Sequence, residues 1–214
     1  MSKKKISILV IVLVLLIDQT LKIWIKTNFR IGEEIRLIGN WFILHFIENN
    51  GMAYGFEFAG EYGKIALSLF RIVAVAAIGW YLFREIKKGI PTGLVVSISL
   101  ILAGAIGNII DSAFYGLIFS DSYGRVAEVF PAEGGYATFL HGAVVDMLYF
   151  PMIKTTWPSW SPINAGESFV FFRPVFNIAD SAISVGIGMI LVFYRNFFNE
   201  NHKVNTEEAE AEKV

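Results

Sequence analysis

Cysteine is absent from the 214-residue chain, which excludes disulfide bonds, thiolate nucleophiles and Cys-type zinc sites. The three histidines, His45, His141 and His202, form no H-E-x-x-H motif, so we expect neither a zinc protease nor any bound metal. The sequence also lacks a G-x-S-x-G elbow and a glycine-rich phosphate loop. The formal net charge of -1 gives no support for a nucleic-acid partner.

Charged residues are scarce as well, at 17% of the chain against about 25% in an average soluble domain. Hydrophobic residues make up 55%, and the mean hydropathy is +0.55. Four apolar segments are long enough to cross the hydrocarbon core as helices, which takes about 20 residues: residues 6–25, 62–83, 91–110 and 178–193. We therefore predict an α-helical integral membrane protein with four transmembrane helices.

The first apolar run follows a lysine-rich start and is similar to a secretory signal. It continues into DQTLKIWIK rather than a small-residue cleavage site, which favours an uncleaved first span. Basic residues flank the spans on one predicted side, which the positive-inside rule makes cytoplasmic: Lys3, Lys4, Lys5, Arg84, Lys87, Lys88, Arg195 and Lys203. Both termini are then cytoplasmic.

Two longer segments, residues 27–61 and 111–176, fall on the extracytoplasmic side in this topology. Aromatic and β-branched residues in the first of them predict strands near the membrane surface. We expect a small β-rich cradle outside the membrane, within a single domain spanning residues 1–200. Residues 201–214 form an acidic cytoplasmic tail.

Eight polar residues in apolar surroundings are all predicted to lie toward the outer leaflet: Asp18, Lys22, Asn49, Asn108, Asp111, Asp146, Asn177 and Asp180. Ionisable groups at such depth are costly, which makes them candidates for function. A shared site near the outer membrane face is the simplest explanation for their clustering.

Asp18 and Lys22 are four residues apart, so they share one helix face and can pair. Their pairing either lets Lys22 snorkel to the headgroups or supports a site. Asn108 and Asp111 also share a face, as part of a site or as ordinary polarity at the end of a span.

Asp146 and Asp180 form the most informative pair. Two carboxyls that share a proton can hydrolyse a peptide, because the ionised one takes a proton from water and the neutral one protonates the carbonyl oxygen. Asn177 is a plausible N-cap, and a helix N-terminus favours the ionised form of Asp180, which makes it the preferred base. Alternatively, the two acids cap helices and never meet.

A small membrane transporter or scaffold with buried acids is the second functional hypothesis. A proton or ion relay needs polar residues that reach both faces of the membrane. The inner halves of two spans, residues 6–16 and 185–193, carry no ionisable residue. This pattern argues against a continuous relay.

Five sequence blocks, in this order, resemble the lipoprotein signal peptidase (signal peptidase II) family of bacterial intramembrane aspartic proteases. They are DQTLK at 18–22, NNGMAYGF at 49–56, GAIGNIID at 104–111, GAVVDMLYF at 142–150 and FNIADSAISVG at 176–186. The resemblance implies a bacterial inner-membrane enzyme without a cofactor, with its active site near the outer leaflet. It implies removal of the signal peptide from prolipoproteins carrying a diacylglyceryl-cysteine, on the N-terminal side of that lipobox cysteine. It also implies contact with membrane lipid and sensitivity to globomycin-type inhibitors.

By position, the resemblance makes Asp146 and Asp180 the catalytic dyad. It assigns substrate-binding or supporting roles to Asp18, Lys22, Asn49, Gly51, Asn108, Asp111 and Asn177.

The chain departs from the family pattern at two places. Ser112 stands where the family has an arginine, and Arg125 or Arg173 are candidates to replace it. Residues 120–138 and 153–173 look like insertions, which implies different substrate access or partner contacts.

Overall fold

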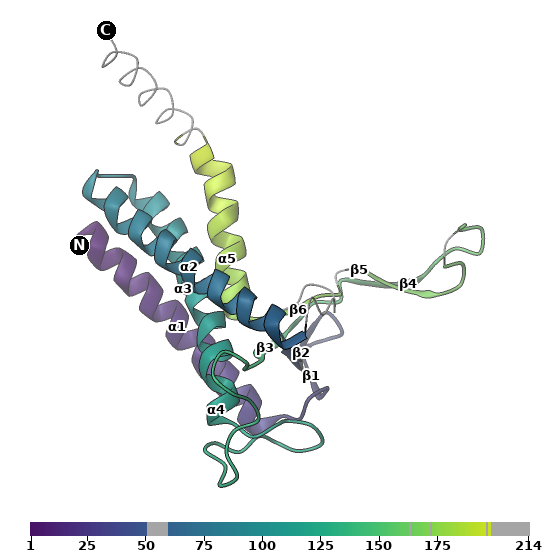
Figure 1. Cartoon of the computed structure of the whole chain (residues 1–214). Coiled ribbons are helices and arrows are strands. Elements are labelled where there is room, and N and C mark those ends of the chain that lie inside the picture. The colour runs from purple at the N-terminus through teal and green to yellow at the C-terminus, as the bar shows by residue number, and fades with distance from the viewer. Residues whose placement is uncertain (51–59, 163, 172, 196, 198–214) are drawn as a thin grey trace.

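The computed structural model describes residues 1–50, 60–162, 164–171, 173–195 and 197. It has long helices joined at one end to a small antiparallel sheet (Figure 1). Gly51, the rest of the block that ends at residue 56, and the predicted tail at 201–214 lie outside the described residues.

Among the described residues, three helical segments are long and apolar enough to cross a membrane. They are α1 (Lys3–Asn28), most of α2 (Gly60–Lys87), and α3 (Thr92–Ile110) together with its continuations η1 (Asp111–Tyr115) and α4 (Gly116–Ile118). A shorter apolar helix, Ile178–Tyr194, consists of α5 (Ile178–Met189) and η2 (Ile190–Tyr194). The membrane class predicted from composition is therefore correct.

The third helical segment continues past the predicted end at residue 110, as far as Ile118. The predicted topology puts Asp111 at the start of the extracytoplasmic segment 111–176. Its side chain is instead fully buried and paired with Lys22, so the helix continues through it.

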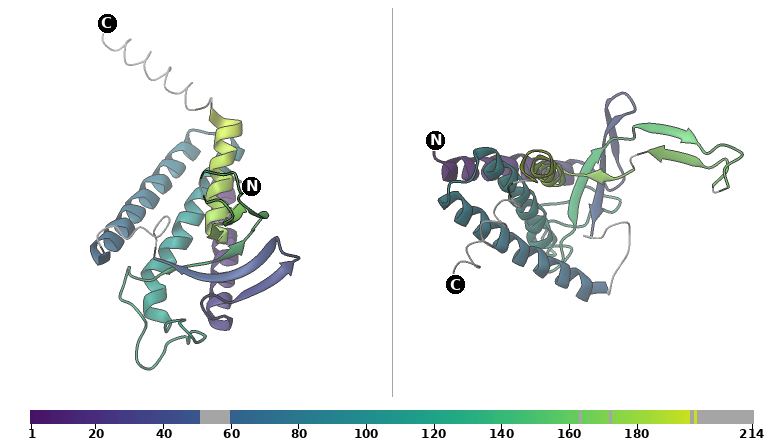
Figure 2. Two further views of the ribbon diagram at one scale, coloured as in Figure 1. Left: turned by 90° about the vertical axis from the view of Figure 1, so that its right-hand side faces the viewer. Right: turned by 90° about the horizontal axis from the view of Figure 1, so that it is seen from above.

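Helix α3 lies at the centre of the helical part, in contact with α1, α2 and α5 (Figure 2). Glycine makes this close packing possible, because a Cβ at Gly104 would lie 2.2 Å from the carbonyl oxygen of Ala179 in α5. A Cβ at Gly107 would lie 2.8 Å from an Asp18 oxygen in α1. The absence of a side chain at Gly104 and Gly107 thus lets α5 and α1 approach α3 closely.

The main sheet has the strand order β1-β2-β3-β6, and each neighbouring pair is antiparallel. Its strands are β1 (Glu34–Ile38), β2 (Phe42–Asn49), β3 (Val144–Tyr149) and β6 (Val175–Phe176). The strands predicted in residues 27–61 are present as β1 and β2. Asp146 lies in the middle of β3, opposite Ile47 of β2.

The sheet packs on the end of α1 through a buried apolar cluster that includes Ile25, Phe46, Val145 and Met147. The side chains on either side of Asp146 therefore belong to this core, which fixes the position of β3. A second apolar cluster, around Leu82 and Leu94, joins α2 to α3.

Strands β4 (Ile153–Thr156) and β5 (Ser168–Phe171) form a separate two-stranded hairpin within the predicted second insertion. It extends sideways from the helices in both Figure 1 and the view from above in Figure 2.

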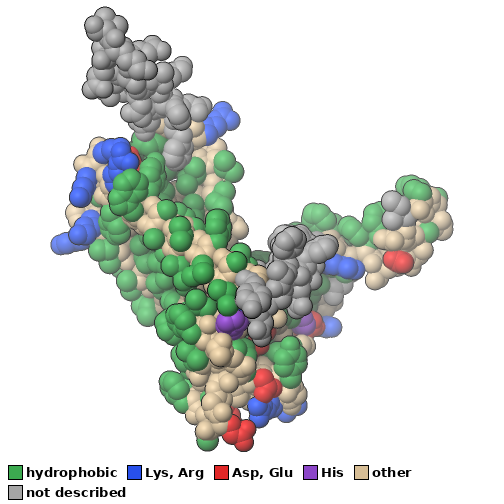
Figure 3. All heavy atoms as spheres, viewed as in Figure 1, with side chains coloured by type: hydrophobic (Ala, Val, Ile, Leu, Met, Phe, Trp, Pro, Cys, Tyr) green, Lys and Arg blue, Asp and Glu red, His purple; other side chains and the backbone are tan. Residues whose placement is uncertain are grey.

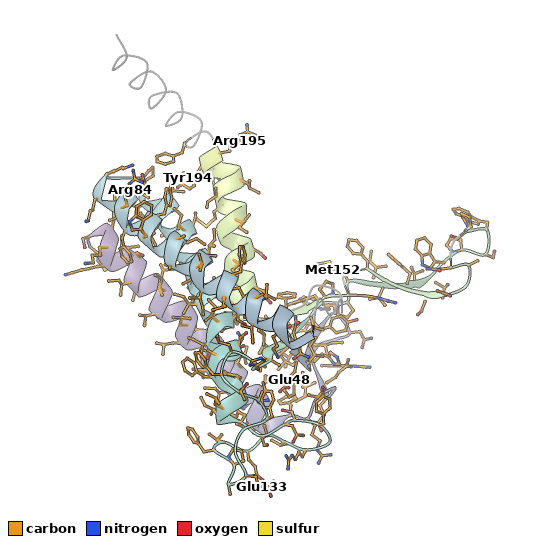
Figure 4. The ribbon with its side chains drawn as sticks, viewed as in Figure 1. Glu48, Arg84, Glu133, Met152, Tyr194 and Arg195 are labelled. Carbon is orange, nitrogen blue, oxygen red and sulfur yellow. The ribbon has the colours of Figure 1, made fainter. Side chains whose placement is uncertain are left out.

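Basic side chains gather at the end of the helices farthest from the sheet (Figure 3). Arg84 and Arg195 lie at this end, whereas Glu133 lies at the opposite end (Figure 4). The Lys3 ammonium donates to the Gly89 carbonyl oxygen at 2.8 Å, which places the start of α1 beside the α2–α3 turn. The basic groups at the three predicted cytoplasmic positions thus share one end of the molecule.

Candidate active site

Asp146 is held by two amide side chains in a nearly closed environment. Asn177 Nδ2 donates to its Oδ1 at 2.7 Å, and Asn49 Nδ2 donates to its Oδ2 at 3.2 Å. Asp146 is 2% exposed. Burial, and then the negative charge of Asp180, raise the pKa of Asp146 to about 7. This carboxyl is therefore suited to carry a proton at neutral pH.

Asp180 lies in the first turn of α5, where Asn177 is the N-cap. The Asp180 backbone N–H donates to Asn177 Oδ1 at 2.8 Å, and the Asn177 backbone N–H donates to Asp180 Oδ2 at 3.4 Å. Asn108 Nδ2 also donates to Asp180 Oδ1 at 2.8 Å. The predicted N-cap is confirmed, and it is part of a reciprocal capping box.

Asn177 links the two acids directly. Its side-chain nitrogen bonds to Asp146, and its side-chain oxygen accepts from the Asp180 backbone. The same nitrogen also donates to Asn108 Oδ1 at 3.2 Å and to the Val145 carbonyl oxygen at 3.3 Å. Asp146 and Asp180 thus belong to one hydrogen-bonded cluster, formed by β3, α3 and the start of α5.

Lys22 lies next to this cluster, between two further carboxylates. Its ammonium is 2.9 Å from Asp18 Oδ2 and 2.8 Å from Asp111 Oδ2, and it donates to Asn108 Oδ1 at 3.0 Å. Lys22 is fully buried, so the alternative that it snorkels to the headgroups is wrong. The other predicted role of the Asp18–Lys22 pair, support of a site, stays a prediction.

The same charged trio fixes the backbone beside each acid of the candidate dyad. Asp18 Oδ1 accepts the Ala179 backbone N–H at 2.9 Å, one residue before Asp180. Asp111 Oδ2 accepts the Val145 backbone N–H at 3.2 Å, one residue before Asp146. Because both carboxylates are held by Lys22, one ammonium group positions both chain segments.

Gln19 is a member of this network that the charge pattern of the sequence missed. Its side-chain nitrogen donates to Asp18 Oδ2 at 3.1 Å, to Asp111 Oδ1 at 2.9 Å and to the Gly107 carbonyl oxygen at 3.2 Å. Tyr115 in turn donates to Gln19 Oε1 at 3.2 Å. Gln19 carries no charge, so its place in the DQTLK block was the only available signal.

Lys26 was also missed, although it lies one helical turn beyond Lys22. Its ammonium pairs with Glu48 of β2, donates to Ser122 Oγ at 3.0 Å and lies 4.7 Å from the centre of the Tyr136 ring. Glu48 lies where the helices meet the sheet (Figure 4). The repeat of polar residues at every fourth position of α1 could have revealed this second buried pair.

The candidates for the missing arginine are not supported by the structure. Arg125 pairs with Asp121 on the surface, and Arg173 is exposed. The charges of both Asp180 and Asp146 act on Arg71 of α2. Ser112 is buried, and its hydroxyl donates to the Asn108 carbonyl oxygen at 3.1 Å.

Among the described residues, no group of three or more His, Asp or Glu side chains is arranged to hold a metal ion. Gly51, the remaining predicted site residue, lies outside the described part of the chain.

Residues 10–196 match the family model described as Signal peptidase (SPase) II. The chain belongs to the signal peptidase II family. Its members include the lipoprotein signal peptidase of Porphyromonas gingivalis, which is 51% identical over 191 residues, covering 89% of this chain and 83% of that protein. The lipoprotein signal peptidase of Amoebophilus asiaticus is 38% identical over 183 residues, covering 84% of this chain and 73% of that protein.

The fold is also similar to solved structures. A bacterial membrane enzyme determined by the in meso method at 2.3 Å resolution aligns with a TM-score of 0.58 and 24% identity, covering 91% of both chains. A second, at 1.9 Å resolution, aligns with a TM-score of 0.56 and 26% identity, covering 88% of this chain and 91% of the other. This signal peptidase II is thus a membrane-bound aspartic protease that processes lipoproteins, and not a transporter or scaffold.

Proposed function

We propose that Asp146 and Asp180 together activate the water that cleaves a diacylglyceryl-modified prolipoprotein on the N-terminal side of its lipobox cysteine. The observation that carries this proposal is the Asn177 side chain, which bonds to Asp146 at 2.7 Å and to the backbone of Asp180 at 2.8 Å. It connects both acids in one hydrogen-bonded cluster, in which Asp146 is buried and the charge of Asp180 acts on it.

The different environments of the two acids indicate which one acts as the base and which one as the acid. Asp180 stands at a helix N-terminus and accepts hydrogen bonds from Asn108 and from the Asn177 backbone, and we assign it the role of base. Asp146 has a pKa raised to about 7 by burial and by Asp180, which favours its neutral form at the same pH. In this assignment the two carboxyls act as one unit and Asp146 carries the proton.

Hydrolysis then follows in two proton-balanced steps. Asp180 removes a proton from water as the water oxygen bonds to the scissile carbonyl carbon, and Asp146 gives its proton to the carbonyl oxygen. When the C–N bond breaks, the proton held by Asp180 passes to the leaving amine, and Asp146 regains its proton as the new carboxyl group forms. No covalent enzyme intermediate is required.

The remaining predicted site residues position this pair. Asn108 connects Lys22 to Asp180, and Asn177 connects Asp180 to Asp146. Asn49, the last residue of β2, donates to Asp146 Oδ2 at 3.2 Å.

The proposed membrane placement has four spans, with both termini in the cytoplasm of a bacterium and the sheet at the outer face of the inner membrane. The basic groups at the end opposite the sheet support this orientation. The helix Ile178–Tyr194 rises roughly 25 Å, slightly less than the hydrocarbon thickness of about 30 Å. Asp180 would then lie near the outer leaflet, within reach of a substrate held in lipid by its diacylglyceryl group, and of globomycin-type inhibitors.

The test is cleavage of a diacylglyceryl-modified prolipoprotein by the purified enzyme in vesicles. Asp146→Asn and Asp180→Asn should each abolish cleavage while retaining the thermal unfolding transition. Asp121→Asn is the matched control, because the Asp121 side chain is 40% exposed and forms its ion pair with Arg125. Substantial cleavage by either dyad variant would refute the assignment.

A further inference from the structure

The β4–β5 hairpin has two chemically different faces. Cross-strand pairs place Ile153 opposite Phe171 and Thr155 opposite Phe169 on one face. Trp157 packs edge-on against Phe169, with ring centres 5.1 Å apart, so it lies on the same side. We call Ile153, Trp157, Phe169 and Phe171 the aromatic face.

The opposite face is more polar. Thr156 pairs with Ser168 there, both are exposed, and the half-buried Val170 follows two residues later in β5. The hairpin is thus amphipathic, with one apolar face and one polar face. This pattern is typical of antiparallel strands that have one face in an apolar environment and the other in water.

No other described element covers the aromatic face. Ile153 is 56% exposed and Phe171 51%, while Trp160 in the connecting turn is 81% exposed. A two-stranded hairpin by itself is marginally stable in water, so an uncovered face of this kind implies a stabilising surface.

The position of the hairpin indicates which surface this is. The hairpin runs sideways from the sheet, transverse to the long helices (Figures 1 and 2). Apolar side chains gather along the edge that faces the Arg84 end of the helices, and an acidic side chain shows on the other edge (Figure 3). With the helices in the membrane, the apolar edge is directed toward the bilayer.

We propose that the aromatic face of the β4–β5 hairpin binds the headgroup region of the outer leaflet, so that the hairpin lies on the membrane surface. Tryptophan is the side chain best suited to this layer, since its ring is apolar and its N–H remains in contact with water. A lipid surface is favoured over a protein partner because the bilayer is already beside the hairpin in every molecule of a membrane enzyme.

This attachment would bear on the active site, because the hairpin is inserted between the strand that carries Asp146 and the short strand that precedes Asp180. A hairpin bound to the surface would hold β3 and β6 at a constant depth relative to the lipid-anchored substrate. The inference rests on the proposed placement of the sheet at the outer face.

The absence of cysteine allows a direct test by single-cysteine labelling of the full chain. Ile153→Cys and Phe171→Cys probe the aromatic face, and Thr156→Cys and Ser168→Cys are matched controls on the opposite face of the same strands. Each variant is labelled with an environment-sensitive fluorophore and reconstituted in vesicles of zwitterionic and anionic lipid. Quenching by lipids brominated on the upper acyl chain is compared with quenching by aqueous iodide.

We expect several-fold stronger quenching by bromolipid at positions 153 and 171 than at 156 and 168, and the reverse order for iodide. Equal iodide quenching on both faces would overturn the proposal, because the hairpin would then be surrounded by water. Protection of the aromatic face from both quenchers would also overturn it, because a second protein copy would then cover that face.

The same variants separate this inference from the proposed function. Each should retain prolipoprotein cleavage, and an impermeant thiol reagent should reach residues 156 and 168 from outside intact spheroplasts. Failure of that labelling would refute the outer placement, whereas normal labelling without bromolipid quenching would refute the lipid contact alone.

Discussion

Asn177→Ala is the most informative substitution in the network, because one buried side chain serves both acids of the proposed dyad. It removes the N-cap of α5 and, in the same step, the 2.7 Å hydrogen bond to Asp146. The other acid, Asp180, keeps its bond from Asn108, so the variant weakens the connection without removing either carboxyl.

The magnitude follows from the two interactions lost. Removal of an N-cap costs about 1 kcal/mol of stability. Asp146 becomes charged as it gives up its proton in the transition state. A hydrogen bond to a charged group contributes roughly 1.5–3 kcal/mol, which corresponds to about a 10- to 150-fold loss in rate. We expect a modest fall in the free energy of unfolding and a larger fall in kcat/KM for prolipoprotein cleavage.

The pH profile gives a second readout whose sign can be worked out. The amide of Asn177 donates to Asp146 and so lowers its pKa, in opposition to burial and to the charge of Asp180. Without that donor the pKa of Asp146 rises further. Asp146 then keeps its proton to higher pH, and the alkaline limb of kcat/KM should move upward from its wild-type position near pH 7.

The assay is cleavage of a diacylglyceryl-modified precursor in vesicles between about pH 5 and 9, with thermal unfolding measured on the same samples. Asn28→Ala is the control, because Asn28 is an exposed asparagine at the end of α1 whose side chain donates to the Trp24 carbonyl oxygen and to Thr27 Oγ1. An Asn177→Ala enzyme with unchanged kcat/KM and an unshifted alkaline limb would refute the reasoning.

Two further predictions concern the framework of the site. Lys22→Met leaves the buried carboxylates of Asp18 and Asp111 without their cation. It should lower the free energy of unfolding by roughly 3–5 kcal/mol, measured in a denaturation series in detergent. A loss below about 1 kcal/mol would show that the ion pairs of Lys22 contribute little to stability. Gly104→Ala should separate α3 from α5 and lower both stability and cleavage, because its Cβ would lie 2.2 Å from a backbone oxygen. Gly188→Ala, which meets nothing within 4 Å, is the matched control, and equal behaviour of the two variants would contradict the packing argument.

Local sequence patterns predicted the helical part of the fold well. Long apolar runs located the helices. The predicted helix ends were less accurate, because a charged side chain can lie within a membrane helix when it has a buried partner of opposite charge. Asp111 has such a partner in Lys22, and the helix continues beyond it.

The arrangement of the site was predicted where its residues are close in sequence, as with Asp18 and Lys22 or Asn177 and Asp180. It was not predictable where the partners are distant. Asn49 and Asp146 are 97 residues apart, and only the β2–β3 register brings them together.

The substitute for the missing arginine could not be found for a similar reason. The preferred candidates were arginines in the outer segment, but Arg125 bonds to its neighbour Asp121 on the surface. Arg71 comes from a helix that the sequence does not place beside the two acids, although its charge interacts with both.

The central claim is that Asp146 and Asp180 act as one catalytic unit. Its most direct test is a double-mutant cycle on kcat/KM for prolipoprotein cleavage, with Asp146→Asn, Asp180→Asn and the double variant in the same vesicles. Groups that act together show strongly non-additive losses. We predict that each single variant loses as much activity as the double variant. Independent losses that add on a free-energy scale, or a single variant that retains substantial activity, would contradict the claim.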